Sequence, residues 1–171
     1  EVGLMAATKI RQKGYTEAAI FASRHSYFAT SQRVQAFISS CERLGIETDE
    51  KYILKGSSTR NGGYEIGKQY AALKEPPKMI FCDSDAIALG ALRAFHEEGI
   101  SVPGDAELLS IGMLDPEAAS YYVPSLSVVE MPNKEIGQQV LRLMRKKVLN
   151  NDMSSEHVKV HAKLMLRESF S

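Results

Sequence analysis

The chain has 171 residues, 44% of them hydrophobic and 25% charged, which fits one globular domain with one sizeable core. Basic and acidic residues number 21 each, so no overall charge attracts nucleic acid or an acidic membrane surface. No apolar run approaches the roughly 20 residues that span a bilayer. The distant cysteines Cys41 and Cys82 suit a reduced pair, and their spacing excludes a metal site.

Apolar periodicity, interrupted by glycine and proline, predicts a regular alternation of helices and strands as far as residue 112. The expected elements are helix 4–12, strand 17–23, helix 31–44, strand 51–54, helix 62–75, strand 78–82, helix 85–97 and strand 106–112. This alternation is typical of βαβ units. We therefore predict an α/β fold, a Rossmann-like parallel sheet with helices on both faces.

The rhythm changes after Gly112, where a mixed polar and apolar segment is bracketed by prolines. A helix is expected over 133–149, with Asn133 as its N-cap. The tail "HVKVHAKLMLRES" alternates strictly, which predicts an edge strand with His157 and His161 on its solvated face rather than at a metal. Because the chain opens on Glu1 inside a helical pattern, we expect a fragment of a longer protein.

Two carboxylates, Asp83 and Asp85, follow the predicted strand 78–82. They lie at the carboxyl edge of the sheet, where ligands bind in open α/β folds. Ser84 or Asp85 also suits the N-cap of the next helix, so cap and ligand contact both stay open for Asp85. Asp83 is expected in a surface loop. Phosphatases of the haloacid dehalogenase type also carry Asp-x-Asp, but Gly-Thr follows there and Ala86-Ile87 follow here.

Other catalytic patterns are missing from the sequence, which has no G-x-S-x-G elbow, P-loop or dinucleotide-binding glycine motif. We therefore expect no catalytic residue, metal or cofactor. Arg33 starts the predicted helix 31–44, where a cation opposes the helix dipole. Bidentate hydrogen bonding to a ligand would explain its place, and a surface ion pair would explain it equally well.

Several motifs together resemble the effector-binding domain of LacI/GalR-family transcriptional regulators. They are "SDAIALGALRAF" (84–95), "VPGD" (102–105), "SIG" (110–112), "VPSLSVVEMPNKEIG" (123–137) and the closing "LMLRES" (164–169). The resemblance covers essentially the whole chain. It implies a periplasmic-binding-protein-like fold of two α/β subdomains with a ligand cleft between them. Residues 15–128 and 155–171 would form one subdomain, and 1–14 and 129–154 would belong to the other, incomplete one.

Matched position by position, the resemblance also implies a set of effector-binding residues. They are Tyr27, Ala29, Arg33, Ser58, Ser84, Asp85, Leu114 and Asp115. The chain departs from the family at Leu114, where members carry an aspartate that reaches the effector, and Asp115 comes one position later. This departure leaves open whether Asp115 takes over or the effector is atypical.

The function that the resemblance implies is that of a cytoplasmic, non-enzymatic transcriptional regulator. It would bind a small effector, a sugar or sugar derivative, act as a homodimer, and control DNA binding allosterically. Contact with operator DNA would be made only through an N-terminal helix-turn-helix domain that is missing from this chain, and no membrane partner is expected. The alternative is a periplasmic sugar-binding protein of an ABC transporter.

Overall fold

One six-stranded sheet organises the molecule, in the order β2-β1-β3-β4-β5-β6. The computed structural model describes residues 1–24, 28–112, 117–149 and 154–171. The strands are β1 (Ala19–Ser23), β2 (Ile53–Gly56), β3 (Met79–Cys82), β4 (Glu107–Gly112), β5 (Ser127–Glu130) and β6 (Lys163–Met165). The first five run parallel, and β6 pairs antiparallel with β5. The predicted α/β fold with a parallel sheet is confirmed.

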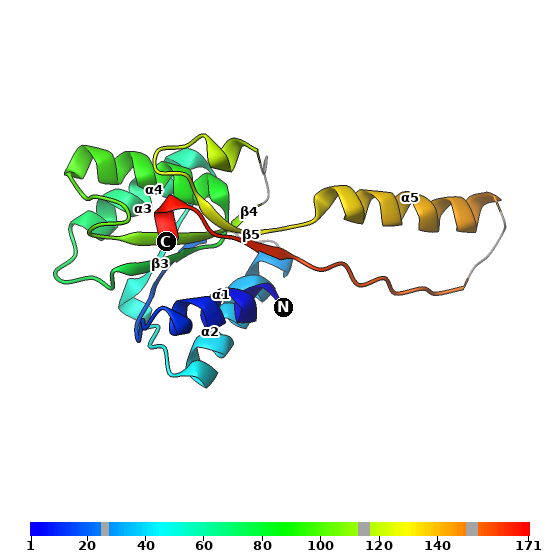
Figure 1. Ribbon diagram of the computed structural model, residues 1–171, viewed down its shortest axis with the longest axis horizontal. Coiled ribbons are helices and arrows are strands. Elements are labelled where there is room, and N and C mark those ends of the chain that lie inside the picture. The colour runs from blue at the N-terminus through cyan, green and yellow to red at the C-terminus, as the bar shows by residue number, and fades with distance from the viewer. Residues whose placement is uncertain (25–27, 113–116, 150–153) are drawn as a thin grey trace.

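Helices cover both faces of the sheet, as Figure 1 shows. They are α1 (Val2–Gln12), α2 (Phe28–Leu44), α3 (Arg60–Ala71), α4 (Asp85–Glu98) and α5 (Asn133–Leu149), with short 3-10 turns η1 (Glu50–Tyr52), η2 (Ala118–Ser120) and η3 (Glu168–Phe170). The helices α1 and α2 pack on one face, and α3 and α4 pack on the other. All five predicted helices are therefore confirmed, with boundaries shifted by a few residues.

Strand alternation divides the apolar residues between two cores. In β3, Met79 and Phe81 face α1 and α2, whereas Ile80 and Cys82 face α3 and α4. On the first face, the ring of Phe37 stacks on that of Phe81 with centroids 3.9 Å apart. A strand that is buried on both faces reads as a continuous apolar run, which explains why "MIFC" carries no polar residue.

Glycines bring α3 and α4 into close contact. A Cβ atom at Gly90 would lie 1.9 Å from the carbonyl oxygen of Arg60, and one at Gly63 would lie 2.1 Å from that of Ile87. No side chain fits into such gaps. The two glycines therefore set the distance between the helices, and so the position of the α4 N-terminus at the sheet edge.

The C-terminal residues close the core. The Ser169 hydroxyl accepts a hydrogen bond from the Ser127 N–H and donates one to the carbonyl oxygen of Leu108, both at 2.8 Å. Phe170 is buried in the core beneath α1. Two strands that neighbour each other in the sheet, β4 and β5, are thus tied together by the last turn of the chain.

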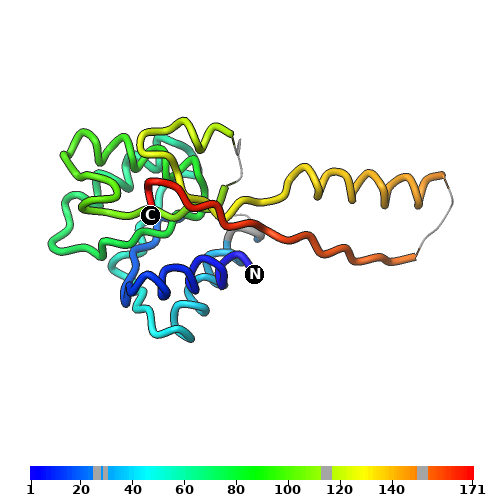
Figure 2. Tube along the Cα trace, in the orientation of Figure 1, coloured from blue at the N-terminus to red at the C-terminus, as the bar shows by residue number. Residues whose placement is uncertain are grey.

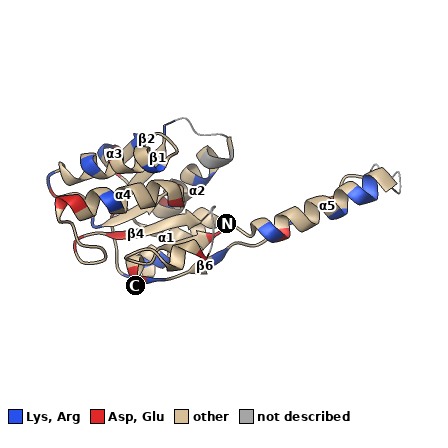
Figure 3. Cartoon of the chain, turned by 90° about the horizontal axis from the view of Figure 1, so that it is seen from above, with Lys and Arg blue, Asp and Glu red and all other residues tan. Residues whose placement is uncertain are grey.

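A long arm, which we define as residues 131–162, leaves the sheet between β5 and β6. Figures 1 and 2 show α5 projecting from the sheet and residues 154–162 returning alongside the helix. Glu156 joins the two by ion pairs to Arg142 and Lys146 at 2.5 and 3.2 Å. Basic residues line the helix (Figure 3), and none of its 17 residues is buried. The rest of the molecule we call the body.

Three expectations need correction. The strand β5 was not foreseen, because its four residues follow a proline-rich segment that we interpreted as irregular. The strand expected over the alternating tail shrinks to β6, since only Lys163–Met165 lie opposite β5 and residues before them run past its end. Residues 1–14 were assigned to a second subdomain, yet Ala6, Ala7 and Ile10 of α1 lie in the core of the sheet. The burial of these apolar side chains holds α1 against this sheet.

Candidate functional site: the carboxyl edge between β1 and β3

The strand order creates a topological switch point at the carboxyl ends of β1 and β3. The chain leaves β1 toward α2 on one face and leaves β3 toward α4 on the other, although the two strands are neighbours. Open α/β sheets bind ligands at such a topological switch point, because the diverging loops leave a gap between them. The predicted site residues of these two strands therefore belong to one place in the fold.

Asp83 lies at the centre of this edge. Its N–H donates to the carbonyl oxygen of Phe21 at 3.0 Å, and its Oδ2 accepts the N–H of Ser23 at 2.7 Å. The residue is only 1% exposed, so the expected surface loop is wrong. Burial raises the pKa of the Asp83 carboxyl, while the hydrogen bonds from Ser23, the neighbouring Ser84 and the charge of Arg33 act in the opposite direction. Within the described residues, Oδ1 has no hydrogen-bond partner.

Ser84 and Asp85 begin α4. Ser84 is the N-cap, with its hydroxyl accepting the N–H of Ile87 at 3.5 Å, which settles the cap between the two candidates. Asp85 is the first helical residue and is buried, and its Oδ1 accepts the N–H of Ala86 at 3.0 Å. A carboxylate at this position also offsets the positive end of the helix dipole. Both side chains therefore lie at the edge where they were expected.

Arg33 and Ser58 approach the same edge from other elements. Arg33 lies in the second turn of α2 and is half-buried, and its charge reaches the carboxyl of Asp83. Ser58 is exposed in the turn between β2 and α3, one strand further out than β1. There Thr59 caps α3 by accepting the N–H of Gly62 at 3.1 Å. The structure thus places Arg33 at the edge where Ser84 and Asp85 begin α4, and it leaves Ser58 at the rim.

Part of the predicted set lies outside the described residues. This holds for Tyr27, Leu114 and Asp115, and for the side chain of Ala29, whose backbone belongs to α2. Their roles stay predictions.

Sequence reasoning missed Ser23 and undervalued Asp83. The signal that could have found them is their position: each stands at the end of one of two strands that are neighbours in a switch-point topology. That topology becomes apparent only once the strand order is known. Across it, the Asp83 carboxylate reaches the backbone of the adjacent strand.

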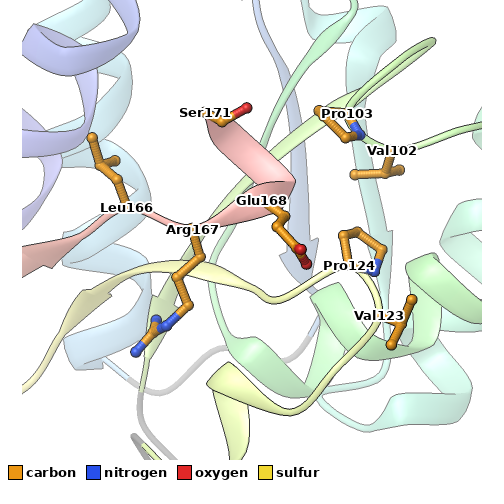
Figure 4. Close-up of a pocket in the computed structure, with 8 residues that line it drawn as sticks. All are labelled: Val102, Pro103, Val123, Pro124, Leu166, Arg167, Glu168 and Ser171. Carbon is orange, nitrogen blue, oxygen red and sulfur yellow. The ribbon is translucent and has the colours of Figure 1, made fainter.

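A hollow of about 670 Å³ lies at the opposite edge of the sheet (Figure 4). Its lining comes from Val102, Pro103, Val123, Pro124 and the residues after β6. The polar groups here are used internally: Glu168 accepts hydrogen bonds from the Ser125 N–H and hydroxyl at 2.7 and 2.9 Å, and Arg167 donates to the carbonyl oxygen of Leu126 at 2.8 Å. Such an arrangement fixes the chain end rather than presenting groups to a ligand.

Two searches of the described residues bear on other site classes. No group of three or more histidine, cysteine, aspartate and glutamate side chains in the described ranges could hold a metal ion. None of the helices described is long and apolar enough to cross a membrane.

Comparison with known proteins adds the family to this geometry. Residues 7–170 match the family described as the periplasmic binding protein-like domain. The chain belongs to this family. The match runs from the middle of α1 through the whole sheet and the arm, and therefore includes the carboxyl edge between β1 and β3.

The relatives of this domain are transcriptional regulators. It is 27% identical to the HTH-type transcriptional repressor PurR of Mannheimia succiniciproducens, over 99% of this chain and 50% of that protein. A LacI family transcription regulator from Clostridium acetobutylicum is 30% identical, with a TM-score of 0.91 over 97% of this chain and 62% of that one. The resemblance to effector-binding domains of LacI-type regulators is confirmed. The transporter alternative is not favoured, since these relatives are regulators.

A third comparison concerns fold alone. A LacI family regulator from Enterococcus faecium, solved with bound ribose, is 20% identical, with a TM-score of 0.84 over 99% of this chain and 62% of that one. The chain spans about half the length of the curated relatives and about three-fifths of the solved ones.

Proposed function

We propose that this domain binds a small effector, a sugar or sugar derivative, at the carboxyl edge between β1 and β3. The observation that carries the proposal is that α2, which holds Arg33, and α4, which begins with Ser84 and Asp85, lie on opposite faces of the sheet and start from the same switch point. A guanidinium, a hydroxyl and a carboxylate offer both donors and acceptors, the combination that hydroxyl groups require. The ribose in the Enterococcus faecium structure supports a sugar-like effector.

The exposed apolar face of α5 is evidence for a second subdomain, which would close over this edge. Apolar side chains of α5 such as Leu141, Val148 and Leu149 are 63–76% exposed, and burying such a face is the usual source of a helix's stability in a protein. We assign residues 129–154 to that subdomain. Two chain crossings, after β5 and before β6, would then connect the subdomains and act as the hinge.

Closure of the cleft would couple the effector to DNA. An effector that binds the closed arrangement more tightly shifts the equilibrium by its difference in affinity for the two arrangements. The relatives named as repressors support a DNA-binding segment elsewhere in the full-length protein. On this proposal the domain senses a ligand and carries out no reaction.

A homodimer would use an exposed apolar face beside α4. Leu89, Leu92 and His96 of this helix line a hollow of about 370 Å³ with Tyr122 and Val123. Val123 is 95% exposed, so Val123→Asp leaves the fold intact. We expect this variant of the full-length protein to sediment as a monomer and Ala72→Asp, at the exposed C-cap of α3, to remain a dimer. A monomeric parent protein would contradict the dimer.

The effector proposal is tested by a thermal-shift screen of the full-length protein against sugars, sugar derivatives, nucleobases and organic acids. A ligand at 100 times its Kd stabilises by about 2.7 kcal/mol, enough for a clear shift. We expect Arg33→Ala to abolish the shift of the strongest ligand. Arg43→Ala, an exposed cation at the end of the same helix, should leave it unchanged. An unchanged shift in Arg33→Ala would move the site away from this edge.

A further inference from the structure

The carboxyl edge contains a buried carboxyl group with one oxygen that the fold leaves unpaired. Asp83 is 1% exposed, yet its Oδ1 has no hydrogen-bond partner within the described residues. Native proteins pair nearly all buried polar atoms, because an unpaired one loses its hydration without compensation. Arg33 lies close enough to favour the ionised carboxyl, but it does not hydrogen-bond to Oδ1. The unpaired Oδ1 therefore lowers the stability of the body, while Oδ2 links β3 to β1 through the Ser23 N–H.

Side chains also take up N–H groups at the starts of α3 and α4. A free N-terminus attracts phosphate or carboxylate through its unpaired N–H groups and its dipole. Here Ser84 and Asp85 occupy N–H groups of α4, and Thr59 occupies one of α3. With Asp83, two buried carboxylates stand at the start of α4.

The positively charged residues at this edge do not outweigh the negative charge of the two carboxylates. Arg33 is half-buried, whereas Arg24 and Arg60 are exposed and lie toward β2, where Arg24 donates to the carbonyl oxygen of Lys55 at 3.3 Å. Water and salt screen exposed charges far more than buried ones. Among the described residues, the buried or half-buried charges at the switch point are therefore the carboxylates of Asp83 and Asp85 and the guanidinium of Arg33.

We propose that Asp83 is a specificity-determining residue of the effector site that excludes anionic ligands. The inference rests on the proposed function and narrows it: the effector is a neutral molecule rich in hydroxyl or N–H groups, and phosphorylated or carboxylated molecules are rejected. Asp83 acts by its charge from beneath the edge, without touching the ligand. The stability lost through the unpaired oxygen is then what the protein gives up in order to reject anionic ligands.

Asparagine at position 83 separates this role from a structural one. Its carbonyl oxygen can still accept the N–H of Ser23, while the charge is lost. We expect Asp83→Asn to melt at the same or a higher temperature than the parent. A structural carboxylate would show the opposite, a lower melting temperature with unchanged ligand selectivity.

The experiment is calorimetric titration of the full-length protein at low salt with matched pairs of probes. The pairs are D-ribose with D-ribose 5-phosphate, D-glucose with D-glucose 6-phosphate, and adenosine with its 5′-monophosphate. In each pair that binds, the neutral member should bind at least about tenfold more tightly, and Asp83→Asn should remove most of that ratio. Asp83→Ser serves as a second variant. Asp49→Asn, at the N-cap of η1 on the opposite edge, is the control that leaves the ratio unchanged.

Three results would overturn the inference: equal or tighter binding of the phosphorylated members, an unchanged ratio in both Asp83 variants, or no binding within any pair. The last two leave the proposed function standing if the broader screen finds an effector whose binding Arg33→Ala abolishes. The proposed function fails separately, if no ligand in that screen depends on Arg33.

Discussion

The body and the arm obey the same local rules and differ in what surrounds them. In the body, Phe37, Phe81 and Phe95 are fully buried between helices and sheet. In the arm, α5 has an equally clear amphipathic pattern, yet Leu141 and Met144 are 63% and 56% exposed. Periodicity thus determines that a helix forms and which face is apolar. What covers that face depends on the rest of the polypeptide, so side-chain deletions should have very different effects in the two regions.

The largest contrast is expected for deletions of apolar side chains. Phe81→Ala removes a ring stacked on Phe37 in the core and should lower the free energy of unfolding by about 3–5 kcal/mol. Leu141→Ala in α5 removes an exposed side chain and should change it by less than about 0.5 kcal/mol. Urea unfolding measures both. A large effect at Leu141 would show that the arm is buried in the full-length protein.

Two helical glycines give the next contrast, this time with opposite signs. Gly90→Ala forces a Cβ against the backbone of α3 and should cost about 3 kcal/mol. Gly137→Ala in α5 meets nothing within 4 Å and should stabilise the helix by about 0.5–1 kcal/mol. Thermal unfolding followed by circular dichroism compares the two. Equal effects would mean that α3 and α4 can move apart at little cost.

A smaller loss is expected from the hydroxyl of Ser169. Ser169→Ala leaves the N–H of Ser127 and the carbonyl oxygen of Leu108 without their partner in a buried position, which should cost about 1–3 kcal/mol. The control is Ser120→Ala at an exposed position, for which we expect no measurable change in urea unfolding. A neutral Ser169→Ala would show that water replaces the hydroxyl.

The smallest effect is expected within the arm. Hydrogen bonds from Arg142 and then Lys146 lower the pKa of the Glu156 carboxyl. A lowered pKa means that these contacts hold above the ordinary pKa of glutamate and are lost as the pH falls through the lowered one. Glu156→Gln should therefore speed amide hydrogen exchange around residues 154–160 at pH 7 and leave global unfolding unchanged. High salt should reproduce the effect in the parent protein, since exposed pairs are screened.

The sequence was sufficient for elements with long, unambiguous patterns. The helices and the buried strands up to Gly112 follow from apolar periodicity and from glycine and proline at their ends. It was insufficient for β5 and for the length of β6, because a strand needs a partner and pairing is a property of the sheet. The packing of α1 on the sheet could not be predicted for the same reason. An amphipathic pattern shows which face of a helix is apolar but not which surface that face covers.

The candidate site was predictable in part. Ser84 and Asp85 follow a strand and precede a helix, so their place at the carboxyl edge could be inferred from local order. The burial of Asp83 could not, because it depends on Ser23 of a strand 60 residues earlier. Long-range contacts of this kind distinguish a loop residue from one beneath a binding edge.

The place of the arm between β5 and β6 has a consequence for synthesis. Ser169 and Phe170 complete the core, and they follow the entire arm in the chain. During translation, β1 to β5 are synthesised before the arm. The site of Phe170 in the core stays open until the arm and β6 have been synthesised and β6 has paired with β5. The body is thus the first part to begin folding and cannot finish before the arm is complete.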